Sequence, residues 1–279
     1  MDYSSYIICN NNSHSIIQSI DSLKRQTIKP KKILIIDDGC EIPLETVIDN
    51  ERKDLTFVQN KKCMGRGFSR NLAFQILKEK YIFSLDSTNI IPEDYISKLF
   101  KNYKDSSVTG VYGLINNHES LNGAAYRWRA AHLFRENIDY GKVPLTTSEL
   151  STYATMLDRE HVLDVGNFDK TLRHSEDYDL GQRLYKKKYK ILGDPNLITY
   201  SIKKESIISV LERYWRWNVQ LNMSFSFRSY LKMIHFSLIV MAYSDLRQKE
   251  FLVSLYSLLS PHYFFCKCAS ESLKKNSAQ

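Results

Sequence analysis

Polar residues that could bind a ligand follow three short apolar runs in the first third of the chain. They are the stretches 9–11 (Cys-Asn-Asn), 37–39 (Asp-Asp-Gly) and 86–89 (Asp-Ser-Thr-Asn). In an open parallel sheet, ligands bind beyond the carboxyl ends of the strands, which meet at one edge. Each stretch alone is also an ordinary turn or helix-capping sequence. Only the three together indicate a ligand site.

A fourth polar cluster contains Glu176, Asp177 and Asp179, directly before an apolar helical pattern. One explanation is structural, because a carboxylate in the first turn of a helix stabilises it by about 0.3–1 kcal/mol. The other is catalytic: a partly buried Asp177 could act as a general base and accept a proton from an attacking hydroxyl. The residues alone leave both explanations open.

Alternating strands and helices would have to position these clusters. From Tyr6 to Gly113, short runs rich in Ile, Val and Phe alternate with segments of helical period, which predicts a parallel sheet with crossover helices. The expected strands are 6–9, 32–36, 55–58, 81–85 and 108–113, and the expected helices between them are 15–26, 68–77 and 92–103. Farther along we expect a strand at 153–157 and helices at 176–185 and 207–217, whereas 116–149 is weakly patterned.

The order of the motifs resembles glycosyltransferase family 2. The chain has Ser-Leu-Lys-Arg-Gln at 22–26, Ile-Asp-Asp-Gly-Cys at 36–40, Gly-Arg-Gly-Phe-Ser-Arg-Asn at 65–71, Leu-Asp-Ser-Thr at 85–88, Gly-Asn-Phe-Asp at 166–169 and Glu-Asp-Tyr-Asp-Leu at 176–180. The resemblance extends from 6 to 192. It implies an α/β chain with the GT-A fold, a Rossmann-like nucleotide-sugar-binding fold with a mostly parallel central sheet flanked by helices, plus C-terminal helices.

The resemblance also implies a donor site. Asp37 and Asp38 would hydrogen-bond the nucleobase or ribose, and Asn10 would line the same pocket. Gly65 would belong to the donor site, and Arg70 would lie near the base and the phosphates.

The catalytic and metal residues are implied in the same way. Asp177, with Glu176 beside it, would be the base of an inverting, single-displacement transfer. Asp86 would lie near the ribose and a divalent metal, Mn²⁺ or Mg²⁺, but the second acid of the Asp-x-Asp motif is Thr88. Either Asp86 with Asn89 or His174 holds a more weakly bound metal, or nearby cations replace the metal, or activity has been lost.

The function implied is transfer of a sugar from a nucleotide-sugar donor, which we expect to be a UDP-sugar, to a hydroxyl of a glycan, glycolipid or other glycoconjugate. We expect it to be non-processive, because 214–218 lacks the Gln of the Gln-x-x-Arg-Trp element of processive relatives. The alternatives are a catalytically silent nucleotide-binding scaffold and a nucleotidyltransferase. The latter would have a Gly-rich, basic loop after the first strand, where this chain has Asn-Asn-Asn-Ser.

Composition narrows the partners and the compartment. The net charge of +8 and the pI of about 9.1 favour anionic partners, but the lysines occur in scattered short runs, so no nucleic-acid partner is predicted. The five cysteines show neither CxxC pairs nor zinc-finger spacing, which favours a reducing compartment. The start of the chain does not resemble a signal peptide. We therefore expect a cytoplasmic protein.

We expect a GT-A domain over 1–204 and a C-terminal helical extension over 205–279. No apolar run in 230–268 reaches the roughly 18–20 residues of a spanning helix. The extension could pack on the main domain, or it could lie as an amphipathic appendage on the inner face of a membrane, with lysines at its edge. The sequence does not indicate an oligomeric state.

Overall fold

The structure, a computed structural model, describes all residues except 1, 12, 49–53, 173–174, 219–225 and 277–279. The chain divides into two compact units, 1–118 with 139–203 and 119–138 with 204–279. The whole of 1–204 was expected to form one domain, whereas 119–138 lies in the second compact unit. Those residues belong to the second unit because Trp128 lies in its core with Val210 and Val253.

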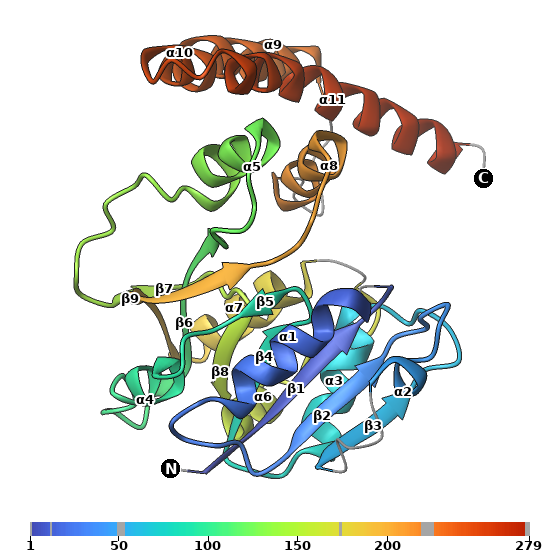
Figure 1. Ribbon diagram of the computed structural model, residues 1–279, viewed down its shortest axis with the longest axis vertical. Helices are drawn as coiled ribbons and strands as arrows, with labels where there is room; N and C mark the ends of the chain where they lie inside the picture. Colours follow the sequence, from blue (N-terminus) through green and yellow to red (C-terminus); the bar gives the residue numbers. More distant parts are fainter. Residues whose placement is uncertain (1, 12, 49–53, 173–174, 219–225, 277–279) are drawn as a thin grey trace. The chain divides into compact units, whose positions relative to one another are not determined.

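The first unit is built on one sheet, which has nine strands among the described residues, in the order β3-β2-β1-β4-β8-β6-β9-β5, with β7 paired to β9 (Figure 1). The strands are β1 (Tyr3–Cys9), β2 (Ile33–Asp37), β3 (Leu55–Gln59), β4 (Tyr81–Asp86), β5 (Asn89–Ile90), β6 (Val108–Asn117), β7 (Leu145–Thr147), β8 (Ala154–Asp158) and β9 (Lys190–Ser201). Strands β1 to β4 pair in parallel, as predicted. Strand β8 runs antiparallel to both β4 and β6, so the sheet as a whole is mixed.

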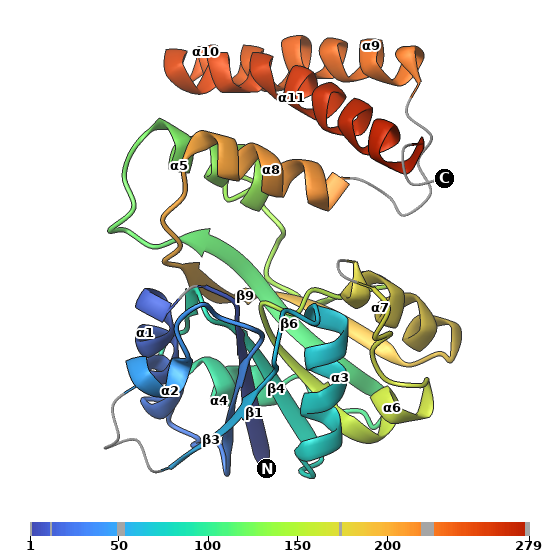
Figure 2. The same ribbon diagram turned by 90° about the vertical axis from the view of Figure 1, so that its right-hand side faces the viewer.

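Helices cover both faces of this sheet. Figure 2 shows α1 (Ser13–Lys24), α2 (Leu44–Val47) and α4 (Tyr95–Phe100) on one side and α3 (Arg66–Ile76), α6 (Arg159–Asp164) and α7 (Glu176–Lys186) on the other. Side chains alternate along β1 accordingly, since Ile7 packs with α1 and Tyr6 packs on Phe74 of α3. Burial on both faces explains why β2 is an almost continuous apolar run. The expected α/β class is confirmed.

Strands β5, β7 and β9 were not predicted. Strand β9 contains Asp194-Pro195-Asn196, residues typical of a turn, and the ladder with β6 is irregular at that point. Tyr112 of β6 pairs with Gly193, and the next paired residues are Leu114 and Ile198. The turn-like segment of β9 therefore bulges out of the ladder.

The second unit is helical. It contains α5 (Ala124–Trp128), the π-helix η1 (Arg129–Phe134), α8 (Ile207–Asn218), α9 (Phe227–Phe236), the π-helix η2 (Ser237–Ala242), α10 (Tyr243–Arg247) and α11 (Phe251–Asn276). The Trp128 indole donates to Ser257 Oγ at 2.9 Å, and the buried Arg129 pairs with Glu205 at 2.8 Å. None of the described helices combines the length and the apolar character needed to cross a bilayer.

Candidate active site

The carboxyl ends of β1, β2 and β4 lie side by side at one edge of the sheet. Cys9 pairs with Asp37, and the residue before Cys9 pairs with Asp86. Asn10 and Asp38, which follow their strands, therefore continue at the same edge. The parallel register brings together the polar clusters that the sequence places after separate strands.

Asp37 holds the turn that follows β2. Its carboxylate accepts hydrogen bonds from the backbone N–H groups of Cys40, at 2.8 Å, and Leu44, at 3.0 Å. Gly39 in the same turn has φ +76°, and a Cβ there would lie 2.4 Å from the backbone nitrogen of Cys63. The close approach of the two loops therefore requires glycine. Asp37 is buried and acts on the protein's own backbone.

Asp38 organises the loop that leads into α3. Its Oδ1 accepts from Asn60 Nδ2 at 2.7 Å, Ser69 Oγ at 3.0 Å and the Met64 N–H at 3.0 Å, while its Oδ2 accepts from the Gly65 N–H at 3.0 Å. Only 2% of Asp38 is exposed. An ionised carboxylate has about four acceptor positions, and this one uses its positions inside the protein. The acid that the resemblance assigns to the nucleobase or ribose thus fixes the loop containing Gly65.

The solvent-facing part of this edge is formed by the turns after β1 and β2. Asn10 is exposed, and its side-chain amide donates to the backbone oxygen of Asp38 at 2.8 Å. Beside it lies a cavity of about 180 Å³, lined by Asn11, Cys40, Glu41 and Ile42. Burial raises the pKa of Cys40 to about 12, so this thiol stays protonated at neutral pH. Of the residues that line this cavity, Asn11 belongs to the predicted stretch 9–11, whereas Cys40, Glu41 and Ile42 were not predicted to bind a ligand.

Arg70 is a buried cation between two acids. Helix α3 directs its guanidinium to Glu176, with which it forms an ion pair, and its second terminal nitrogen lies 3.7 Å from Asp86 Oδ1. The guanidinium also lies 5.9 Å from the centroid of the Phe168 ring. Its Nε has no hydrogen-bond partner among the described residues. Arg70 therefore links the start of α7 to the end of β4.

The protonation of this group follows from its surroundings. Burial alone would lower the pKa of Arg70, but the nearby carboxylates of Glu176, Asp86 and Asp177 raise it above its usual value. Burial raises the pKa of Glu176, and contact with Arg70 opposes that rise. Because only 1% of Glu176 is exposed and it contacts Arg70, its role is to hold the cation.

Asp177 differs from its neighbour Glu176 in exposure and in partners. It is half-buried in the first turn of α7, where its Oδ2 accepts from Thr152 Oγ1 at 3.3 Å and its Oδ1 accepts from the Tyr178 N–H at 2.9 Å. Thr152 lies two residues before Ala154, which pairs with Leu85 next to Asp86 at the end of β4. Asp177 therefore lies at the polar edge and keeps acceptor positions for a further donor.

The donor atoms available to a metal are few. Asp86, whose side chain is 35% exposed, is followed by Thr88, and the buried Asn89 donates its amide to the Tyr153 carbonyl at 3.3 Å. His174 lies outside the described residues. Within the described part of the chain, no three His, Cys, Asp or Glu side chains gather as a metal cluster. One carboxylate fits a Mg²⁺- or Mn²⁺-type ion only where substrate phosphates supply further ligands.

Two further residues of the edge were missed by the sequence reasoning. Asn60 follows β3 and binds Asp38, and Thr152 precedes β8 and binds Asp177. A signal existed for Asn60, since it is a polar residue directly after a predicted strand. The sequence contains no such signal for Thr152, because its position at this edge depends on the antiparallel direction of β8.

The chain matches known proteins in sequence. A family model described as Glycosyl transferase family 2 matches residues 4–166. An uncharacterized glycosyltransferase of Methanocaldococcus jannaschii is 27% identical over 226 residues, which are 71% of this chain and 74% of that protein. A poly-beta-1,6-N-acetyl-D-glucosamine synthase of Staphylococcus aureus is 24% identical over 220 residues, 76% of this chain. The match spans 52% of the synthase, about half its length.

Solved structures share the fold at low sequence identity. The mannosyltransferase PcManGT of Pyrobaculum calidifontis, solved with GDP-Man and Mn²⁺, has a TM-score of 0.61 at 14% identity and covers 99% of this chain and 79% of its own. GalNAc-T7, solved with UDP, GalNAc and Mn²⁺, has a TM-score of 0.58 at 14% identity over 98% of this chain and 58% of its own. Since the family model covers more than half of the sequence, the chain belongs to glycosyl transferase family 2 and is a glycosyltransferase with the GT-A fold.

Proposed function

We propose that the protein is an inverting, non-processive glycosyltransferase that moves a sugar from a UDP-sugar to a hydroxyl of a glycan, glycolipid or other glycoconjugate. The observation that supports this most is the contrast between Asp177 and Glu176. Glu176 forms a buried ion pair with Arg70, whereas Asp177 is half-buried and retains acceptor positions beside Thr152. A carboxylate in that state suits a general base.

Asp177 would act on the acceptor. The acceptor hydroxyl attacks the anomeric carbon from the face opposite the nucleotide, and its proton passes to Asp177 as the new C–O bond forms. The bond from the anomeric carbon to the diphosphate breaks in the same step, and the nucleoside diphosphate leaves with the electron pair. One displacement inverts the anomeric centre. The Thr152 hydroxyl, which donates to Oδ2, would orient the base.

The donor would lie along the edge formed by Asn10, the cavity at Asn11 and Cys40, and Asp86. Asp37, Asp38 and Gly65 would serve the donor indirectly, by holding the loops that shape this edge. Arg70 supplies a buried positive charge 3.7 Å from Asp86. Asp86 would hold a divalent ion together with the donor's diphosphate, with Asn89 and His174 as the other proposed ligands. Such an ion neutralises charge on the leaving group.

The setting we propose is the reducing cytoplasm. No cysteine of the described residues takes part in a disulfide. Cell-surface polysaccharide or glycoconjugate assembly is the pathway we propose, supported by the similarity to the polysaccharide synthase.

The test combines a panel of sugar nucleotides with one substitution. Transfer and donor hydrolysis are measured with and without Mn²⁺, for the wild type and for Asp177→Asn. Loss of a general base costs about 10²–10⁴-fold in rate, so Asp177→Asn should lose that much turnover while its melting temperature stays near that of the wild type. Asp179→Asn, two residues away and paired with Arg183 on the helix surface, is the matched control and should stay active.

Each other result has a defined meaning. An Asp177→Asn enzyme with near-normal turnover would rule out Asp177 as the base. UDP binding seen as a thermal shift, without turnover of any donor, would make the chain a catalytically silent scaffold. Formation of a sugar nucleotide from a sugar phosphate and a nucleoside triphosphate would make it a nucleotidyltransferase.

A further inference from the structure

Helix α11 presents several large apolar side chains to solvent. Its first sixteen residues, 251–266, include no Asp, Glu, Lys or Arg. Phe251, Leu252, Leu255 and Leu259 are each more than half exposed. Several inward-facing positions hold small polar residues instead, because Ser254, Ser257 and Ser260 are buried. Val253 and Phe264 are buried as well, so the helix has an apolar inner contact and, in addition, large apolar side chains on the side where a surface helix in water has polar ones.

The neighbouring helices repeat the pattern. Helices α9, η2 and α10 follow one another and lie beside α11 in the second unit (Figures 1 and 2). Their outward residues include Leu231, Leu238, Ile239, Val240 and Leu246, each about half exposed. Inward, Ser237 donates to the Ser257 backbone oxygen at 2.6 Å, and Ser257 donates to the buried Asp245 at 2.6 Å. Polar contacts therefore join the two helices, and the apolar side chains face out.

We name the outward surface of 227–265 the apolar face. Its exposed apolar side chains lie on helices that contact one another rather than singly, and exposed apolar side chains gathered in this way mark an interaction surface. The buried serines and Asp245 show that the helix pair does not need this face for its own packing.

The exposed charge next to the apolar face is positive. Arg228, Arg247 and Lys249 are exposed, and none of them pairs with a carboxylate of the described residues. Two acids of the same segment are occupied elsewhere in the second unit: Asp245 contacts His132 at 2.8 Å, and Glu250 contacts Arg127 at 2.9 Å. A partner of this face therefore has to be apolar and negatively charged.

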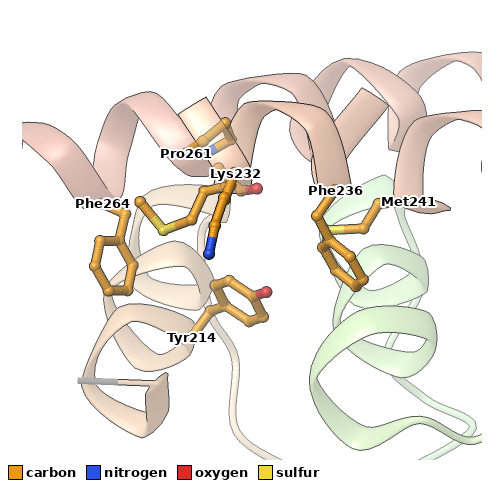
Figure 3. Close-up of a pocket in the computed structure, with 8 residues that line it drawn as sticks. Tyr214, Lys232, Phe236, Met241, Pro261 and Phe264 are labelled. Atoms are coloured by element: carbon orange, nitrogen blue, oxygen red, sulfur yellow. The ribbon is translucent and has the colours of Figure 1, made fainter. Parts of the chain in front are cut away.

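A cavity opens among the same helices. It has a volume of about 180 Å³ and is lined mainly by Tyr214, Met233, Phe236, Met241 and Phe264, together with Lys232. Figure 3 shows the Lys232 side chain pointing into this space, toward Tyr214. The Lys232 amino group therefore points inward, toward α8, and does not belong to the outward surface.

We propose that the apolar face lies on an anionic lipid bilayer, with its leucines and phenylalanines at the boundary of headgroups and acyl chains and its cations at the lipid phosphates. This is how an interfacial amphipathic helix with basic residues binds a membrane. A second copy of the chain fits less well, because a two-fold contact would place the same unpaired cations of both copies in one interface.

The test is flotation of the full chain, without donor or acceptor, with vesicles of phosphatidylcholine alone or mixed equally with phosphatidylglycerol. Binding to the mixed vesicles should fall about tenfold for each apolar side chain removed, so Phe251→Ser with Leu255→Ser should lose about a hundredfold. Each cation near the surface contributes about fivefold, so Arg228→Gln with Arg247→Gln should weaken binding to the mixed vesicles by about 25-fold.

The matched control is Val143→Ser with Leu145→Ser. These side chains of the first unit are 70% and 58% exposed, against 68% and 52% for Phe251 and Leu255. The control should bind like the wild type, and added salt should release the wild type from the mixed vesicles. Binding is measured apart from transfer, so a negative result here leaves the proposed chemistry untouched.

Three results would overturn the proposal. The wild type could stay with the soluble fraction in both vesicle preparations. It could bind neutral and mixed vesicles equally, which would remove the anionic partner. Light scattering could reveal a dimer that the Phe251→Ser, Leu255→Ser variant dissociates and that ignores vesicles, which would make the face an interface between copies.

Discussion

The ends of β2 and β4 hold their acids in opposite ways, although they lie at the same edge of the sheet. At β2, Asp37 and Asp38 are 4% and 2% exposed and bind N–H groups of the loops that follow. At β4, the side chain of Asp86 is 35% exposed, and its nearest cation is 3.7 Å away. One end uses carboxylates to build loops, and the other leaves a carboxylate accessible.

The comparison shows that a family motif contains residues with two physical tasks. A carboxylate whose oxygens are occupied by buried donors can bind a ligand only by breaking those bonds, each worth about 1.5–3 kcal/mol for a charged acceptor. A half-exposed carboxylate has no such cost. Asp37 and Asp177 each accept two hydrogen bonds, so burial rather than the number of bonds separates the acids that shape the edge from Asp86 and Asp177, which can meet a substrate.

The largest expected effect comes from removing the cation that holds the acids of the β4 end. Arg70→Met leaves Glu176 buried without its partner, and breaking a buried pair in this way costs about 3–5 kcal/mol of the free energy of unfolding. Urea denaturation measures this loss. The double variant with Glu176→Gln should recover part of it, because the two residues form one interaction. If the stability losses of the two single variants simply added in the double variant, Arg70 and Glu176 would not be coupled as the structure shows.

A smaller loss is expected at the β2 end. Asp38→Asn places an amide NH₂ among the donors of Met64 and Gly65, and each buried donor left unpaired costs about 1–3 kcal/mol, so we expect a loss of about 2–3 kcal/mol. Asp54→Asn is the control, since Asp54 forms an exposed pair with Lys24 and should change stability by less than about 1 kcal/mol. Unchanged stability with weakened UDP binding would instead make Asp38 a direct ligand contact, as the resemblance implies.

The parallel half of the fold could be predicted from the sequence because β1, β2 and β4 are mostly buried and contain short apolar runs rich in Ile, Leu and Phe. The order of polar residues after those strands was enough to expect one ligand edge. Strand β9 could not be predicted in the same way, because Asp194, Pro195 and Asn196 interrupt it with turn residues.

The roles of the site residues could not be predicted from the sequence, for a different reason. Asp38 is saturated by Asn60, Met64, Gly65 and Ser69, which lie 22 to 31 positions away and approach only once α3 has docked. Glu176 is in contact with a residue 106 positions away, and no local pattern encodes that distance. The sequence could therefore identify the acids but not which of them remain accessible.

The smallest effect on stability is expected at Asp86. A small effect there, next to the larger one at Asp38, would distinguish a ligand-binding carboxylate from one that holds the loops. Asp86→Asn keeps the size of the side chain and removes only a charge that is 3.7 Å from Arg70 and partly solvated, so the free energy of unfolding should change by less than about 1 kcal/mol. UDP binding with Mn²⁺ should nevertheless weaken, by about tenfold for a lost contact of 1.4 kcal/mol, whereas binding without metal should change less. Calorimetric titration of wild type and variant, with Mn²⁺ and with a chelator, measures both. Asp86→Asn could instead destabilise the fold as much as Asp38→Asn and leave nucleotide binding intact. The carboxylates at both strand ends would then stabilise the fold, and other residues would have to bind the metal.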